Sequence, residues 1–177
     1  MSGAGKTTIT GQIEKELKKE GHRVIVIHID DLIEERAKRY NTGHPEWVEY
    51  YMLQWDIYQI AENLFTSVHQ KSTIINLKFY QTENDQCYVK SIDITHCTLI
   101  LIEGIFLQRR EWRSFFDYMV YLDCPKELRY DRVLQRDTYL GDINDRLNKY
   151  ERRYWIAEDY YLKEVKPHLS SDIVIKS

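Results

Sequence analysis

A short glycine-rich run near the start of the chain places the strongest constraint on its fold. The run consists of Gly3, Ala4, Gly5, Lys6, Thr7 and Thr8, and a helical pattern follows it. Glycines let the backbone curl so that successive N–H groups face one phosphate, and the helix N-terminus adds the positive end of its dipole. In such a loop Lys6 reaches the β- and γ-phosphates, and the Thr7 hydroxyl binds Mg²⁺. The run therefore predicts a nucleoside triphosphate site, with ATP and Mg²⁺ as the expected cofactors.

The full form of this motif has a further glycine and a buried strand ahead of it. That glycine would stand one position before Met1, so the sequence contains neither feature. We expect an N-terminally truncated form of the domain, whose reading frame continues upstream with a short apolar strand. Such a strand is central in a parallel sheet, and its loss leaves backbone groups of the neighbouring strands without partners.

The length and composition indicate one domain, residues 1–177. Hydrophobic residues make up 43% of the chain and aromatic residues 13%, which is enough for one core. A net charge of -3, from 25 basic and 28 acidic residues, shows no basic stripe, so we expect no nucleic-acid partner. Neither a membrane-spanning run nor a signal peptide is visible, so we expect a cytoplasmic protein without a membrane partner. The composition is compatible with a homo-oligomer as well as with a monomer.

The chain contains three cysteines, an odd number, at Cys87, Cys97 and Cys124. They lack the close spacing of metal-binding cysteines, and an odd set does not form a complete disulfide framework. We expect all three to be buried thiols.

Apolar runs alternate with helical patterns along the chain. Four runs predict strands: 23–29, 98–102, 118–122 and 172–175. Four stretches predict helices: 7–20, 45–65, 126–136 and 144–165. The alternation predicts an α/β fold of three layers, in which helices cover both faces of a mostly parallel sheet. Residues 73–79 and 87–92, joined by the turn-rich 81–86, predict a β-hairpin beside that sheet.

Acidic residues follow two of the predicted strands directly. Asp30 and Asp31 come after the first strand, and Glu103 comes after the run 98–102. Open α/β sheets bind their ligands at the carboxyl ends of the strands. Phosphoryl transfer to a hydroxyl needs a base on the acceptor side and an acidic group near the magnesium ion. Asp30 and Glu103 are the candidates for these roles, while Asp31 is equally consistent with a helix cap.

At this point the sequence resembles the uridine kinase and nicotinamide riboside kinase family, over nearly the whole chain. SGAGKTT is similar to the family's phosphate loop, and HIDDL to its acidic motif, which implies that Asp30 is the catalytic base. LILIEG is similar to the strand on the magnesium side, which implies that Glu103 and Thr7 hold the metal. The resemblance thus implies an ATP-dependent kinase acting on a small hydroxyl-bearing substrate, with a nucleoside as the leading expectation for that substrate.

The resemblance also implies a substrate pocket and a lid. QWDIYQIAENL resembles a motif that holds ribose hydroxyls, which implies substrate contacts at Trp55 and Asp56. KFYQTEND resembles a hairpin whose tyrosine, here Tyr80, lines the base pocket. RVLQRDTYLGD resembles the start of a C-terminal helical lid, in which Arg136 approaches the ATP phosphates as a catalytic cation. SSDIVI resembles the closing strand.

The predicted lid departs from the family pattern at Leu140, which stands where relatives carry a phosphate-facing arginine. Four other arginines could replace that cation: Arg132, Arg146, Arg152 and Arg153. Arginines on a charged helix more often lie on its solvated face, so we expect these four to be solvated. His28 and His44 have no partner at ligand spacing, so we expect both to be structural.

Two further functions fit the phosphate loop. A regulatory ATPase or switch would need a water-positioning group in place of an organic acceptor, and a degenerate relative would bind nucleotide without turnover. Within the kinases, a non-nucleoside alcohol such as a pantothenate- or glycerate-like acceptor stays open. The position of Asp30 favours an organic hydroxyl as acceptor.

Overall fold

The computed structural model describes residues 1–96 and 99–176. In this part of the chain the strands form three two-stranded sheets. β1 (Val24–His28) pairs in parallel with β4 (Leu99–Glu103), and β5 (Val120–Asp123) pairs in parallel with β6 (Ile173–Lys176). β2 (Ile74–Gln81) and β3 (Gln86–Asp93) form the antiparallel hairpin that the sequence predicts.

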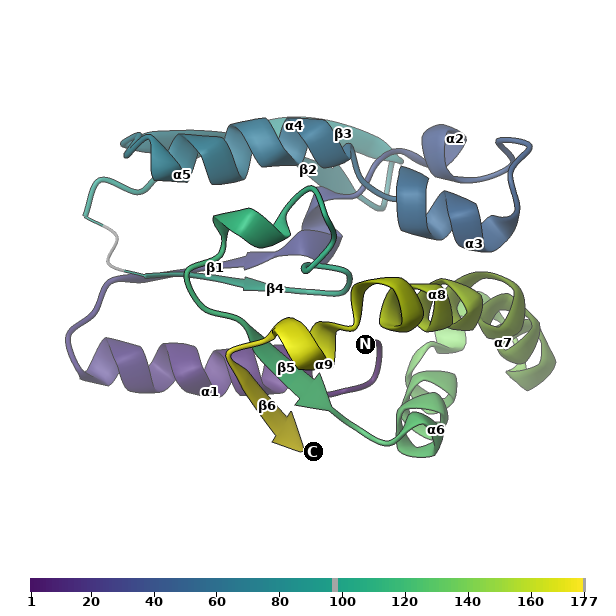
Figure 1. Ribbon diagram of the computed structural model, residues 1–177. Coiled ribbons are helices and arrows are strands. Elements are labelled where there is room, and N and C mark those ends of the chain that lie inside the picture. The colour runs from purple at the N-terminus through teal and green to yellow at the C-terminus, as the bar shows by residue number, and fades with distance from the viewer. Residues whose placement is uncertain (97–98, 177) are drawn as a thin grey trace.

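Helices lie on opposite sides of the β1 and β4 pair, so the prediction of a layered α/β fold is confirmed (Figure 1). One side is covered by α1 (Lys6–Lys19), which contacts both strands. The other side carries the helical segments α4 (Ile57–Ile60), η3 (Ala61–Thr66) and α5 (Ser67–His69), together with the hairpin. No helix among the described residues has the length and apolar character needed to cross a membrane.

The C-terminal part of the chain is mainly helical, as predicted. α6 (Lys126–Arg136) follows β5, and a short turn η5 (Thr138–Leu140) leads into the next helical stretch. That stretch joins three segments into one run from residue 143 to 165: α7 (Ile143–Lys149), η6 (Tyr150–Tyr154) and α8 (Trp155–Val165). Two further short helices are η4 (Arg113–Phe115) and α9 (Pro167–Ser170).

The prediction of one helix over 45–65 is wrong in one respect, because the helix is interrupted at residues 54–56. Before the break lie α3 (Glu46–Val48) and η2 (Glu49–Leu53), preceded by η1 (Ile29–Leu32) and α2 (Arg36–Arg39). After the break, the side chain of Asp56 accepts a hydrogen bond from the backbone N–H of Gln59 at 2.9 Å and caps α4. An aspartate at this position starts a new helix. The apolar periodicity of the sequence therefore continues across residues 54–56, although the helical conformation is interrupted there.

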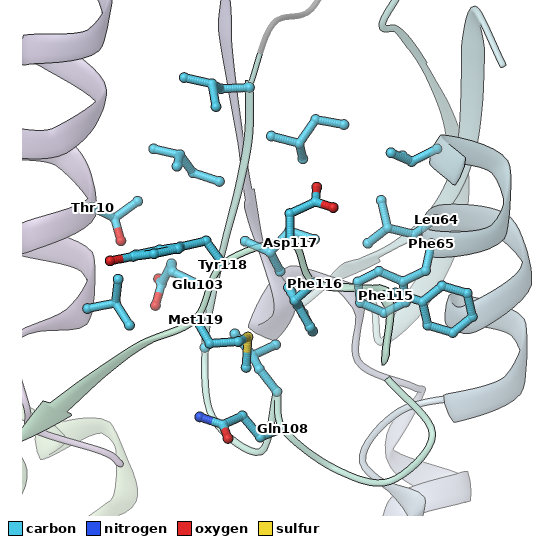
Figure 2. A pocket seen from close by; sticks show the side chains of 18 of the residues that line it. Thr10, Leu64, Phe65, Glu103, Gln108, Phe115, Phe116, Asp117, Tyr118 and Met119 are labelled. Atoms are coloured by element: carbon cyan, nitrogen blue, oxygen red, sulfur yellow. The ribbon is translucent and has the colours of Figure 1, made fainter. Parts of the chain in front are cut away.

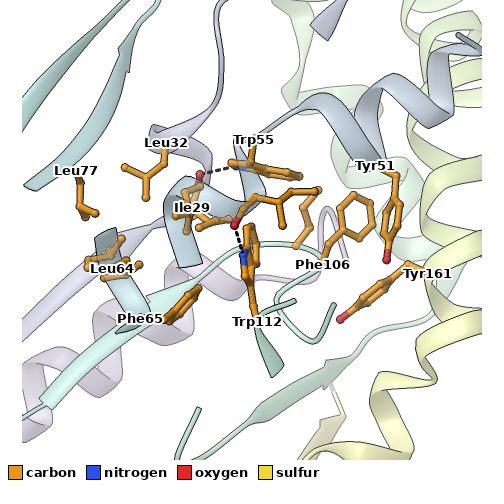
Figure 3. Packing of buried hydrophobic residues seen from close by; sticks show 14 of the residues in the cluster. Ile29, Leu32, Tyr51, Trp55, Leu64, Phe65, Leu77, Phe106, Trp112 and Tyr161 are labelled. Atoms are coloured by element: carbon orange, nitrogen blue, oxygen red, sulfur yellow. Dashed lines mark hydrogen bonds between the residues drawn. The ribbon is translucent and has the colours of Figure 1, made fainter. Parts of the chain in front are cut away.

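An aromatic core lies between the β1 and β4 pair and the helices (Figure 3). The indole N–H of Trp55 donates to the carbonyl of Ile29 at 2.8 Å, and that of Trp112 donates to the carbonyl of Ile57 at 2.9 Å. Buried tryptophans need such partners because an unpaired buried N–H costs about 1 to 3 kcal/mol. The Trp55 bond holds the backbone immediately before Asp30, so the core sets the position of that carboxylate.

The cysteine prediction holds in part. Cys124 is buried and free, whereas Cys87 is free but only half-buried, in the hairpin. Cys97 lies outside the described residues.

Candidate active site

The glycine-rich run forms a tight turn that leads straight into α1. Gly3 and Gly5 have φ angles of 73° and 84°, in the region that favours glycine. A Cβ on Gly3 would lie 2.6 Å from the carbonyl oxygen of Arg129, so this position also requires glycine for lack of space. Ala4 is buried between them. The turn therefore presents the N-terminus of α1 in the manner of an anion-binding loop.

Lys6, at the start of α1, and Asp30, which follows β1, lie close enough for their charges to interact. The Nζ of Lys6 donates to the carbonyl of Met1 at 3.0 Å. Loss of hydration lowers the pKa of Lys6, while the negative charges of Asp30 and Glu103 oppose that shift. Asp30 keeps contact with solvent. The surrounding protein nevertheless reduces its hydration, which raises its pKa, while the positive charges of Lys6 and Arg136 act to lower that pKa. The structure thus brings together the charged groups that the sequence assigns to catalysis.

The Glu103 carboxylate connects the phosphate loop to both strands of the first sheet. Its Oε1 accepts a hydrogen bond from the hydroxyl of Thr7 at 2.9 Å and lies 2.6 Å from Nδ1 of His28. His28 and Glu103 are direct partners in the β1 and β4 register. His28, which the sequence leaves as a structural histidine, therefore orients this carboxylate.

The Thr7 and Glu103 pair fits a magnesium ion. Mg²⁺ takes oxygen ligands and usually binds through one or two protein groups, completed by water and phosphate oxygens. A hydroxyl and a carboxylate beside a phosphate loop supply this donor set. Among the described residues no group of three or more His, Cys, Asp or Glu side chains is arranged to hold a metal ion by itself.

Two charged side chains that sequence reasoning missed hold the start of the loop. Glu158 accepts from the backbone N–H of Ser2 at 2.7 Å, and Arg129 donates to the carbonyl of Ser2 at 3.3 Å. Arg129 and Glu158 pair with each other at 2.6 Å, and both are buried. Arg132 donates to the carbonyl of Gly3 at 3.2 Å. The loop is thereby attached to α6 and α8.

The helical spacing of three arginines could have identified this face of α6. Arg129, Arg132 and Arg136 stand at i, i+3 and i+7, which places them on one side of a helix. Two of them bind the loop backbone, and the charge of Arg136 reaches Lys6 and Asp30. No comparable signal marks Glu158.

The lid arginines differ in their surroundings. Arg136 is exposed and pairs with Asp137 at 2.6 Å, which raises its pKa. Arg153 is wholly buried, where it binds Glu49 at 3.0 Å, so the expectation of a solvated face is wrong for this residue. Arg152 is exposed and lies 3.4 Å from Glu46. Arg146 donates to the carbonyl of Leu134.

Three residues expected to bind the acceptor, Trp55, Asp56 and Tyr80, already make hydrogen bonds within the protein. Trp55 is 2% exposed within the aromatic core. Asp56 is exposed and caps α4. Tyr80 is half-buried in the hairpin, where its hydroxyl donates to Asp85 at 2.9 Å and the guanidinium of Arg39 lies 5.0 Å from its ring centroid. Their roles in substrate binding stay predictions.

Comparison with known proteins gives three related findings. Residues 1–155 match the sequence model of a family described as an AAA domain. A curated uridine kinase of Staphylococcus aureus (strain JH9) is 28% identical over 184 residues, covering 98% of this chain and 83% of the relative. The solved structure of a possible uridine kinase from Bacillus stearothermophilus matches with a TM-score of 0.84 and 41% identity, over 99% of this chain and 84% of that one.

A more distant structure shares the fold. A protein described as a fructose transport system kinase, from Silicibacter sp. TM1040, matches with a TM-score of 0.74 at 17% identity, over 97% of this chain and 84% of that one.

Proposed function

Because the chain belongs to the AAA-domain family and is a uridine-kinase-like P-loop kinase, we propose that it transfers the γ-phosphoryl group of ATP to a hydroxyl of a nucleoside. The observation that carries this proposal is the electrostatic interaction of Lys6 with Asp30, next to the hydrogen-bonded pair of Thr7 and Glu103. Lys6 and the glycine-rich turn suit a triphosphate, and Asp30 suits an acceptor hydroxyl.

In the proposed reaction the acceptor oxygen forms a bond to the γ-phosphorus. The bond between the γ-phosphorus and the oxygen that bridges it to the β-phosphate breaks. Asp30 takes the hydroxyl proton, and the products are a phosphate monoester and ADP. Lys6 and the loop amides hold the β- and γ-phosphates, while Arg136 offsets developing negative charge. Mg²⁺ bound at Thr7 and Glu103 would neutralise phosphate charge.

The nucleoside acceptor is supported by the two relatives that carry the name uridine kinase. We propose Asp56 for the ribose hydroxyls and Tyr80 for the base. Because the indole of Trp55 is covered by the core, we propose that it acts by holding the backbone at Ile29.

The test is ATP consumption with a panel of nucleosides and of small alcohols, including pantothenate- and glycerate-like compounds. We expect consumption to depend on a nucleoside and to yield a nucleoside monophosphate by mass spectrometry. Consumption that needs no acceptor would instead indicate a regulatory ATPase. Binding of ATP without consumption under any condition would indicate a relative without turnover.

A further inference from the structure

A buried carboxylate holds the guanidinium of Arg136 at the C-terminal end of α6. The Nε of Arg136 donates to Oδ1 of Asp137 at 2.6 Å, and its Nη2 donates to Oδ2 at 3.0 Å. Asp137 is 4% exposed, whereas the side chain of Arg136 is 64% exposed. A bidentate pair of this kind fixes the plane of the guanidinium as well as its position. The pair does not use the Nη1 amino group, which can therefore donate to a second anion.

Tyr150 is a further partner of the Asp137 carboxylate. Its hydroxyl donates to Oδ2 of Asp137, the same oxygen that accepts from Nη2 of Arg136. Tyr150 is 3% exposed, and burial raises the pKa of its hydroxyl, so the group keeps its proton and remains a donor. A carboxylate as buried as that of Asp137 is costly unless its oxygens are hydrogen-bonded. The hydroxyl of Tyr150 and the guanidinium of Arg136 supply these bonds.

Aromatic packing fixes Tyr150 relative to α6. The ring centroid of Tyr150 lies 5.5 Å from that of Trp155. Trp155 in turn stacks on Tyr130, with centroids 3.7 Å apart and an angle of 11° between the ring planes. Because Tyr130 and Arg136 both belong to α6, these rings join the helix that carries the cation to η6 and α8. The hydroxyl of Tyr150 therefore has a fixed position from which to orient Asp137.

We propose that Tyr150 is a positioning residue, which acts through Asp137 to aim the guanidinium of Arg136 at the transferred phosphoryl group. The inference rests on the proposed function, in which Arg136 offsets negative charge that develops in the transition state. The charge of Arg136 acts on both Lys6 and Asp30, the groups proposed for the phosphates and for the acceptor. A cation that is oriented in advance needs no reorganisation during the reaction, so a donor that fixes its carboxylate partner contributes to kcat.

The test substitutes Tyr150→Phe, which removes the hydroxyl and keeps the ring. The matched control is Tyr161→Phe in the same helical run, because Tyr161 is also 3% exposed and its hydroxyl accepts from the backbone N–H of Gln108 at 3.1 Å. Each variant loses one buried hydrogen bond, so both should lower the melting temperature. We expect kcat to fall about tenfold or more in Tyr150→Phe alone, with an unchanged KM for ATP, because the contact acts in the transition state.

A second measurement needs neither an acceptor nor turnover. Calorimetry compares the binding of MgADP alone with that of MgADP and aluminium fluoride, a planar anionic mimic of the transferred phosphoryl group. We expect Tyr150→Phe to weaken binding of the mimic about tenfold and to leave the affinity for MgADP unchanged. Wild-type protein that binds neither complex would overturn the proposed function, and this inference with it. Wild-type binding of both complexes, with no difference between Tyr150→Phe and Tyr161→Phe, would overturn the role of Tyr150 alone.

Chemical rescue separates positioning from a general loss of structure. Arg136→Ala should lose transfer, and millimolar guanidinium ion should restore part of it, because Asp137 and Tyr150 hold the ion where the side chain stood. The double variant Arg136→Ala and Tyr150→Phe should not respond to guanidinium. Equal rescue in the two variants would overturn the proposal. A rise of kcat in Tyr150→Phe would also overturn it, because Asp137 would then be withholding Arg136 from the phosphates.

Discussion

Glu158 and Arg129 form a buried ion pair at 2.6 Å, and each also binds the backbone of Ser2. The pair comes from α8 and α6, so it joins the phosphate loop to the two helices that flank the proposed lid. Removing one partner leaves the other charge buried and unpaired, which costs more than the pair contributes.

We expect Glu158→Gln to lower the free energy of unfolding by about 3 to 5 kcal/mol, measured by urea denaturation. The matched control is Asp159→Asn, which breaks the exposed pair between Asp159 and Lys126 on the same two helices. That control should cost about 0 to 1 kcal/mol. Similar losses in the two variants would show that burial does not strengthen the Glu158 interaction.

Asp30→Asn should abolish phosphoryl transfer while leaving ATP affinity within a few-fold. The amide keeps the shape of the side chain but cannot accept the hydroxyl proton. Asp31→Asn is the control, because Asp31 is exposed and follows Asp30 directly in η1. Turnover and calorimetric ATP binding are measured for both variants. Turnover retained by Asp30→Asn would assign the base to another group.

The raised pKa of Asp30 predicts opposite pH dependences for activity and stability. The proposed reaction needs the ionised carboxylate of Asp30, so kcat should rise as pH rises through its folded-state pKa, which lies above the ordinary 3.8. Between these two pKa values the native state binds more protons than the unfolded state, so this group's stabilising contribution declines as pH rises. Melting temperatures against pH should therefore fall more steeply for the wild type than for Asp30→Asn. Parallel curves would contradict the reduced hydration of this carboxyl.

Lys6→Ala should weaken ATP binding and turnover together, because in the proposed reaction the ammonium group contacts the phosphates in both the ground state and the transition state. Lys15→Ala, an exposed position on the same helix, is the control and should change neither. Calorimetry and initial rates provide the two measurements. An unchanged ATP affinity in Lys6→Ala would remove the loop from the nucleotide site.

Two substitutions at Asp56 separate capping from substrate binding. Asp56→Ser keeps a side-chain acceptor for the N–H of Gln59, whereas Asp56→Ala removes the cap at a cost of about 1 kcal/mol. If the carboxylate binds acceptor hydroxyls, both variants should raise the acceptor KM far more than the ATP KM, and only Asp56→Ala should lower the melting temperature appreciably. An acceptor KM that stays at the wild-type value in Asp56→Ser would leave Asp56 as a helix cap alone.

Local patterns in the sequence were enough to predict the phosphate loop, the strands and the hairpin. Glycines at positive φ, the continuous apolarity of 98–102 and the turn at 81–86 act through neighbouring residues. Asp30 and Glu103 could be placed for the same reason, because each directly follows a strand. Trp55 shows the limit of such patterns, since helical spacing indicates burial but not whether the partner is a substrate or Trp112.

By itself the sequence determined which residues the phosphate loop and the strand ends contain, because those features depend on neighbours along the chain. Only the tertiary structure decided which distant groups meet there. Thr7 and Glu103 are 96 residues apart and Ser2 and Glu158 are 156 apart, yet both pairs are hydrogen-bonded. Such contacts depend on how helices pack against strands, and no local periodicity encodes a partner. A cavity of about 980 Å³ between β4 and β5 (Figure 2) likewise arises from the spacing of two sheets, which only packing in three dimensions sets.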